Sequence, residues 1–401
     1  MPRVKPEILK WARESAGLAL DDAARKIDLQ EARGVAGAER LAALESGQST
    51  PTRALLGRMA KQYRRPLLTF YLGSPPRRGD RGQDFRVLPQ NHSLSQESIL
   101  DVLIRDVLAR QGLLRAALED EEEAVRLPFV GSVTPRAGVN GLVSTLQAAL
   151  AISTQQFRAT AGVEEAFNLL RERTEKLGVF VMLLGNLGSH HTALSVETFR
   201  GFALADSVAP FLVINDQDSR AAWSFTLLHE LTHLWLGQTG VSGGAPDREI
   251  EQFCNEVASE FLLPNHELDT LGQLLRSSPD KLEEEISEFA GDRKVSRTLV
   301  VYRLYRANLI GQVQWEQLRE TFRRQWLDRR DSQRDAAREE EGGPSYYVVK
   351  RHRVGSALLS TTARLLAAGA LSTTKAGQVL GVRPNNVQSL FARATSMPRK
   401  S

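Results

Sequence analysis

Apolar residues recur at three- and four-residue steps along most of the chain, which is the spacing of one face of an α-helix. The stretches 93–125 and 163–177 show this pattern most clearly. Three short runs rich in branched and aromatic residues interrupt it and predict buried strands at 178–184, 199–207 and 211–215. The pattern therefore predicts a mainly α protein with a small β-sheet, of the α+β class.

Two more helices are predicted directly after the strands. The first covers about 219–236 and the second 247–263, where Pro264 ends it, and a glycine-rich loop at 237–246 joins them. Helical patterns then continue to about residue 331 and resume near the end of the chain.

Two segments have the composition of linkers: 74–82, rich in Pro, Gly and Arg, and 332–344, charged and containing a Gly-Gly pair. A chain of 401 residues is also too long for a single hydrophobic core. We therefore expect a helical N-terminal domain at 1–73, a linker and helical segment at 74–165, an α+β domain at 166–331 and a small helical C-terminal domain at 345–401.

The bulk composition favours a soluble cytoplasmic protein. Cys254 is the single cysteine, so no internal disulfide can form, which fits a reducing compartment. The N-terminus lacks the apolar core of a signal peptide. No apolar run approaches the roughly 20 residues of a membrane span, so no membrane association is expected.

Charge is distributed unevenly along the chain. Residues 1–80 carry a net charge of +6 and residues 345–401 a net charge of +9, whereas residues 81–344 carry −11. Basic ends of this kind suggest a polyanionic partner such as DNA. A role in solubility alone is an equally good interpretation of the charge.

A metal-binding pattern lies in the helix predicted at 219–236, where His229 and Glu230 are followed by His233. Residues four apart share one face of a helix, so both imidazoles can bind one zinc ion. Glu230 lies beside the first histidine, where its carboxylate can act on a water molecule as a catalytic base. A packing helix that contains the pattern by chance is the alternative interpretation.

A catalytic zinc site needs a third protein ligand. The next helix offers Glu251, and Asn255 lies four residues later on the same face, where it can orient a ligand imidazole. These residues predict a site for one Zn²⁺ ion, although manganese or iron accept similar ligands. The strand 211–215 precedes the metal helix and is expected to be a sheet edge on which an extended peptide substrate pairs.

Residues 178–264 resemble the ImmA/IrrE family of bacterial zinc peptidases. The stretches that carry the resemblance are GVFVML, FRGFALAD, FTLLHELTHLWLG, the E-x-x-C-N of 251–255 and the LLP that follows. The resemblance implies a zincin-like peptidase domain, with His229, His233 and Glu251 as zinc ligands and Glu230 as catalytic residue. It also implies a site-specific protease that cleaves a helix-turn-helix repressor after stress or DNA damage.

Two positions depart from the family pattern. Val257 precedes Ala258 where the family often has Phe, and Cys254 stands where Ala is commoner. Both side chains are small and apolar, so the fold is expected to tolerate them. We interpret Cys254 as a buried core thiol rather than as a metal ligand.

Residues 8–72 resemble the XRE-type helix-turn-helix of phage-like repressors. The matching segments are LDDAARKI, LAALESGQ and PTRALLGRMAKQY. The resemblance implies DNA contacts, for which Arg40 and Gln48 are the candidates, with Arg53 on the phosphate backbone. The long segment 28–37 weakens the match, and a helical domain that binds protein instead is the alternative.

A second helix-turn-helix outline lies near the end of the chain. Ser372 caps a predicted helix, Gly381 forms a turn, and another helix follows. The candidates for DNA contact there are Asn385, Asn386, Gln388 and Arg393. A small helical domain that closes the fold, or forms a homodimer contact, is a slightly better interpretation.

Two functions therefore fit the sequence. The first is a DNA-tethered zinc endopeptidase that cleaves a repressor. The second is a DNA-binding transcriptional or antitoxin-like regulator whose zinc domain is a sensor or scaffold. Glu230 favours the first, because a purely structural zinc site does not need that carboxylate.

Overall fold

The computed structural model describes residues 4–75, 94–238, 248–268, 271, 279–339 and 345–392. Helices dominate it and a single three-stranded sheet is present in these ranges, which confirms the predicted α+β class. The described residues form two compact units. The first contains 4–75, 94–106 and 186–199, and the second contains 107–185 and the described residues from 200 onward.

The first unit is built around four helices and a 3₁₀ turn: α1 (Pro6–Glu14), α2 (Leu20–Lys26), α3 (Gly37–Glu45), α4 (Arg53–Gln62) and η1 (Leu67–Tyr71). Their apolar faces meet in one core. A buried ion pair fastens α1 to α3, since Arg13 Nε lies 2.7 Å from Glu45 Oε1 and Nη2 lies 2.9 Å from Oε2. The first half of α5 (Leu94–Asp120) and the 3₁₀ turn η3 (His190–Thr192) also belong to this unit.

The sheet lies in the second unit and consists of β1 (Phe180–Leu183), β2 (Gly201–Leu204) and β3 (Phe211–Ile214). Its order is β1-β3-β2. β3 pairs in parallel with β1 and antiparallel with β2. Every residue of the three strands is buried, which explains their continuous apolar runs.

The strand order corrects one prediction. The segment 211–215 was expected to be a sheet edge open to a peptide, but β3 is the central strand, paired on both sides. β2 comes earlier in the sequence and turns back onto β3, while β1 takes the opposite side. A peptide substrate therefore cannot pair with β3.

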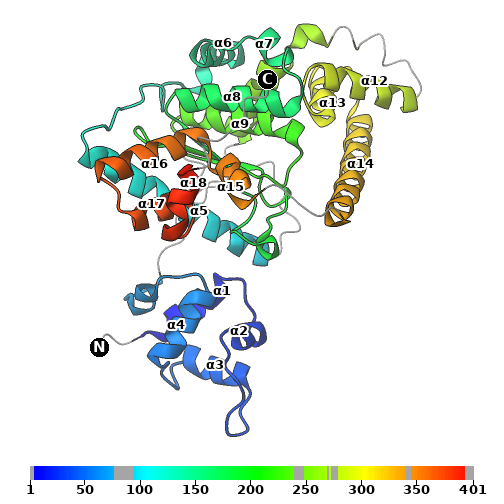
Figure 1. The fold of residues 1–401 in the computed structure, drawn as a ribbon. Helices are drawn as coiled ribbons and strands as arrows, with labels where there is room; N and C mark the ends of the chain where they lie inside the picture. Colours follow the sequence, from blue (N-terminus) through cyan, green and yellow to red (C-terminus); the bar gives the residue numbers. More distant parts are fainter. Residues whose placement is uncertain are drawn as a thin grey trace. The chain divides into compact units, whose positions relative to one another are not determined.

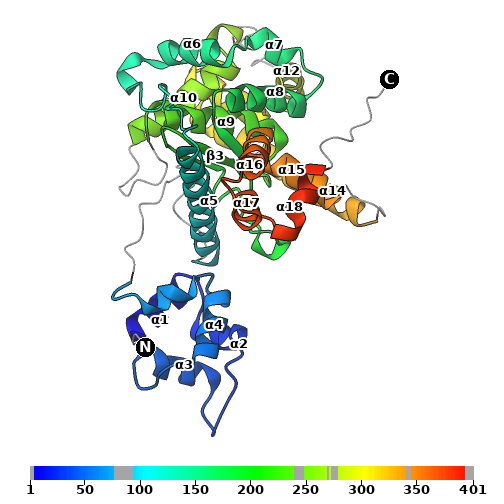
Figure 2. The same cartoon turned by 60° about the vertical axis from the view of Figure 1, so that its left-hand side comes forward.

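The remaining helices belong to the second unit. They are α6 (Val139–Leu150), α7 (Thr154–Arg158), α8 (Val163–Lys176), α9 (Arg220–Trp235), α10 (Arg248–Leu262), α12 (Pro279–Asp292), α13 (Arg297–Arg306), α14 (Gln312–Glu339), α15 (Tyr346–Val354), α16 (Ser356–Ala368), α17 (Thr373–Leu380) and α18 (Val387–Ala392). Short 3₁₀ turns are η2 (Pro135–Ala137), η4 (Asn265–Glu267) and η6 (Pro384–Asn386). α9 and α10 lie on one side of the strands, and α17 and α18 lie on the other (Figures 1 and 2).

Helix α9 lies at the centre of the main core. Its residues from Trp223 to Trp235 are buried except Phe225, which is partly exposed. A helix that is apolar on nearly all sides belongs inside a protein, and α9 packs against α8, α10, β2 and β3. Within the described parts of the chain, no helix has both the length and the apolar character needed to cross a membrane.

Helix α14 corrects a second prediction. The charged segment 332–344 was expected to be a linker, but α14 continues through it to Glu339. Arg, Gln, Ala and Glu favour helix, and pairs one turn apart, such as Arg324 Nε with Glu320 Oε1 at 3.0 Å, support it. Residues 340–344 lie outside the described ranges, as do most of the predicted 74–82 linker and 237–246 loop.

The C-terminal helices dock on the α+β core through a buried ion pair of α8. Arg171 and Glu175 are almost fully buried, with Nε 3.2 Å from Oε1. Arg171 Nη1 also donates to the carbonyl of His352 at 2.6 Å. Glu175 Oε2 accepts from the backbone N–H of Ala357 at 3.1 Å and from the hydroxyl of Ser356, so it caps the start of α16.

Substitution of Glu175 by alanine should lower the free energy of unfolding by about 3–5 kcal/mol, because it leaves the buried Arg171 guanidinium without its counter-charge. Urea denaturation of the full chain measures the loss. Glu172→Ala on the same helix is the matched control, since that side chain is 57% exposed and its pair with Lys176 contributes about 0.5 kcal/mol or less. Equal stability of the two variants would contradict the capping role.

Candidate metal centre

Helix α9 places both histidines of the motif on one buried face. His229 is fully buried and His233 is 4% exposed. The four-residue spacing brings their Nε2 atoms to 3.2 Å from one another. The two imidazoles therefore present their nitrogens to a common point.

Glu251 reaches the same point from α10. Its Oε2 lies 3.3 Å from His229 Nε2, and its Oε1 lies 3.1 Å from His233 Nε2. Burial favours the neutral carboxyl, but hydrogen bonds and charges of the two histidines outweigh burial and hold the pKa of Glu251 below its usual value. The helix after the motif thus supplies a buried carboxylate opposite both imidazoles.

The donor atoms fit a tetrahedral divalent ion. Ligand atoms of His229, His233 and Glu251 all lie within 4.8 Å of one another. Zinc–ligand distances of about 2.0–2.1 Å in a tetrahedron place two ligand nitrogens about 3.3 Å apart, close to the observed 3.2 Å. Two imidazoles and one carboxylate are also the ligand set of a class of catalytic zinc sites. Among the described residues, this is the cluster able to hold a metal.

Two neighbours on α10 have different roles. Asn255 Oδ1 is buried and, within the described ranges, has no hydrogen-bond partner, so it is available to accept from a ligand imidazole. Its orienting role remains a prediction. Cys254 is a fully buried core thiol, as predicted, and does not belong to the metal cluster.

Glu230 is 2% exposed and lies against strand β2. A Cβ added at Gly201 would stand 3.1 Å from Glu230 Cγ, 2.6 Å from Thr226 Cγ2 and 2.9 Å from the carbonyl oxygen of Val213. Only glycine lets β2 approach α9 this closely. Gly201 therefore shapes the space around Glu230, a role that was not predicted from the sequence.

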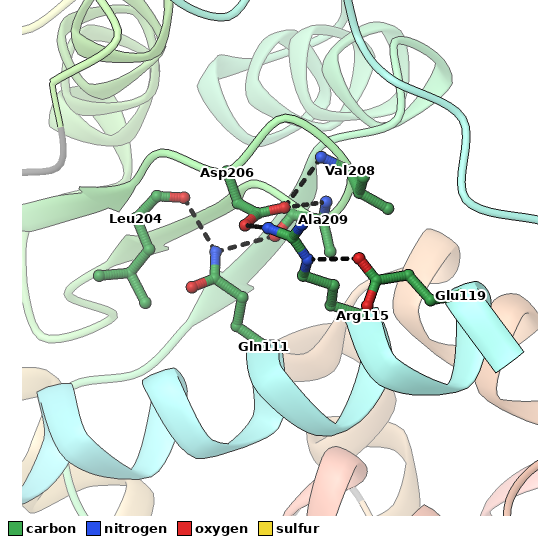
Figure 3. Close-up of polar contacts among 7 residues, drawn as sticks. All are labelled: Gln111, Arg115, Glu119, Leu204, Asp206, Val208 and Ala209. Carbon is green, nitrogen blue, oxygen red and sulfur yellow. Dashed lines mark hydrogen bonds and ion pairs between the residues drawn. The ribbon is translucent and has the colours of Figure 1, made fainter.

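The turn after β2 is held by the second half of α5 (Figure 3). Gln111 Nε2 donates to the carbonyl oxygens of Leu204 at 3.1 Å and Ala209 at 2.8 Å. Asp206 Oδ1 accepts from the backbone N–H groups of Val208 at 2.8 Å and Ala209 at 2.9 Å. Arg115 pairs with the other oxygen of Asp206. These contacts fix the hairpin that presents β2 to α9.

Asp206→Asn should lower the melting temperature at neutral pH by about 2–4 °C, an effect of about 1 kcal/mol. Burial raises the pKa of Asp206, but the backbone hydrogen bonds and Arg115 outweigh it and lower the pKa. The charge therefore stabilises the fold fully above the unfolded pKa of about 3.9, and this contribution disappears as the pH falls through the lower folded value. Melting temperatures of both proteins between neutral and acid pH should converge. A constant difference would contradict this origin.

The candidate DNA contacts of the N-terminal module belong to the first unit, whereas the metal cluster belongs to the second. Gln48 and Arg53 are exposed. Arg40 lies on α3 and donates to the carbonyl of Gln30. A small hairpin closed by the bridge between Ala32 and Val35 separates α2 from α3. The two helices are thus not joined by a tight turn.

Two histidines and an adjacent glutamate on a buried helix, with a carboxylate from the next helix, define the class of metal-dependent peptidases. Residues 174–305 match the family model Peptidase_M78, described as the IrrE N-terminal-like domain. This match includes His229, Glu230, His233 and Glu251 and covers about a third of the chain. Neither the curated proteins nor the solved structures gave a match. Residues 174–305 are therefore similar to the metallopeptidase domain of the ImmA/IrrE family.

Proposed function

We propose that this protein is a zinc-dependent, site-specific endopeptidase coupled to a DNA-binding module. Its substrate would be a helix-turn-helix repressor in a stress response or in the response of a phage or mobile element. The cluster of His229, His233 and Glu251 beside the buried Glu230 carries the proposal. It lies within the segment that matches the peptidase family.

The residues divide the work of peptide hydrolysis. A zinc ion held by the three ligands would supply a Lewis acid for the peptide carbonyl and make a water molecule acidic near neutral pH. Glu230 takes a proton from the attacking water and later donates it to the leaving amine, while the C–N bond breaks. Gly201 keeps the space in which the Glu230 side chain lies.

The burial of the metal cluster favours an alternative function, that of a sensor or scaffold. The four side chains are nearly inaccessible to solvent, with exposed fractions of 0% to 6%. Such enclosure suits a zinc domain that serves as a sensor or scaffold of a transcriptional or antitoxin-like regulator. In the enzyme, it would require a movement that admits the substrate.

A repressor-cleavage assay distinguishes the peptidase from the regulator. The zinc-loaded full chain would be incubated with the helix-turn-helix repressor encoded beside its own gene, and the products analysed by mass spectrometry. One cut bond that disappears with chelator supports the peptidase. Stoichiometric zinc without cleavage, combined with specific binding to promoter DNA, would instead support the regulator.

The DNA role of the N-terminal module needs its own experiment. The full chain should bind its promoter fragment in a salt-dependent manner, with log Kd changing linearly with log salt concentration. Arg53→Ala should reduce the magnitude of that slope by about one, which corresponds to the loss of one phosphate contact. An unchanged slope would remove Arg53 from the interface.

A further inference from the structure

The last two helices of the second unit, α17 and α18, form a tight pair. Between Leu380 and η6 lie three residues, 381–383, and Gly381 adopts the left-handed conformation with φ +64°. A Cβ at Gly377 would stand 2.9 Å from the carbonyl oxygen of Val382, so glycine lets the turn lie directly on α17. Short turns of this length containing glycine join the two helices of DNA-binding helix-turn-helix units.

The buried positions of α17 and α18 are those that hold such a pair together. The fully buried apolar residues are Ala376, Val379, Leu380, Val387 and Leu390. The two helices pack against each other and against η6, and α17 also packs against α16. Sequence and burial therefore agree on one rigid helix-turn-helix rather than on two unrelated helices.

The exposed side of α17, η6 and α18 carries side chains of the kinds that bind duplex DNA. Arg383, Asn385 and Gln388 are exposed around η6 and α18, and Lys375 is exposed on α17. Asn and Gln side chains can pair with adenine edges in the major groove, and Lys and Arg neutralise phosphates.

Charge favours a polyanion over a neutral or basic protein surface. Residues 345–392 contain no Asp or Glu. Arg353 is paired with Asp216 and Arg364 with Glu123. Among the described residues, Lys375 and Arg383 have no acidic partner, so their charges remain available to a polyanion.

We propose that the face formed by Lys375, Arg383, Asn385 and Gln388 binds duplex DNA, as a nucleic-acid site separate from the N-terminal module. The C-terminal pair has the tight turn that α2 and α3 lack. The helices that precede it are fixed to the peptidase core by Arg171 and Glu175. DNA bound by this face would therefore be bound by the same compact unit as the metal cluster. The proposal does not depend on peptidase activity.

Fluorescence anisotropy of the full chain with a labelled DNA duplex of mixed sequence tests the proposal. The double variant Lys375→Ala/Arg383→Ala should raise Kd at least about tenfold and reduce the slope of log Kd against log salt by about two, between about 50 and 200 mM salt. All these side chains are exposed, so the variant should keep the wild-type melting temperature.

Two control variants make the result decisive. Arg324→Ala removes a 74% exposed arginine of α14 and should leave Kd within about twofold. Arg53→Ala measures the contribution of the N-terminal module to DNA affinity in the same assay. An unchanged Kd and slope in the C-terminal double variant would overturn the proposal, because the DNA would then be bound elsewhere, for example by the N-terminal module. Absence of DNA binding by the wild type would overturn it as well.

Discussion

Glu230→Gln should lower the rate of repressor cleavage by about 10²–10⁴-fold while leaving the zinc content of the protein unchanged. The amide has nearly the shape of the carboxylate but cannot accept a proton from water. Glu230 is not a member of the ligand cluster, so the metal should stay bound. Cleavage kinetics and metal analysis on the same preparation measure the two quantities.

Two further variants separate this effect from others. Glu251→Gln removes the charge of a ligand, so it should lower zinc content and activity together. Glu172→Gln makes the same chemical change on the exposed face of α8 and should alter neither. Full activity of the Glu230 variant would eliminate Glu230 as the residue that takes the proton from water.

Gly201→Ala should lower kcat/KM by about 10–100-fold and destabilise the fold by about 1–3 kcal/mol. The new methyl group would stand 2.6 Å from Thr226 Cγ2 and 3.1 Å from Glu230 Cγ. Either β2 or the Glu230 side chain must then move. The experiment compares kcat/KM and urea denaturation, with zinc content measured to show that the ligands remain in place.

A second substitution tests the cause. Thr226→Ser removes the closest methyl group, so it should restore part of the activity of the Gly201 variant; contact with the Val213 carbonyl at 2.9 Å limits the rescue. Gly141→Ala is the matched control, because its added Cβ meets nothing within 4 Å and stabilises helix α6 by about 0.5–1 kcal/mol. If Thr226→Ser restored nothing, crowding of α9 would not be the cause.

The grouping of His229, His233 and Glu251 was predictable because its signal is local. Two histidines one helical turn apart identify a face, and an acidic helix close behind offers one good third ligand, Glu251. The contribution of Gly201 is different in kind. It depends on how closely β2 approaches α9, and no spacing within the sequence encodes that distance.

The errors in the predicted fold also have a physical origin. A buried apolar run predicts a strand but does not identify its partners, so β3 was mistaken for an edge although it lies between β1 and β2. In α14, high charge suggested a linker, whereas helix propensity and ion pairs such as Arg324 with Glu320 carry the helix to Glu339. Contacts between residues far apart, such as Arg171 with His352, leave no local pattern at all.

The capping of α16 by Glu175 has a consequence for synthesis of the chain. The carboxylate leaves the ribosome about 180 residues before Ser356 and Ala357, its partners. At about 5–20 residues per second, Glu175 is synthesised roughly 9–36 s before Ser356 and Ala357. During that interval the metal helix has been made, but the core beside β1 lacks its covering. The nascent protein therefore passes through a stage in which His229, His233 and Glu251 have been made but the fold is not yet finished.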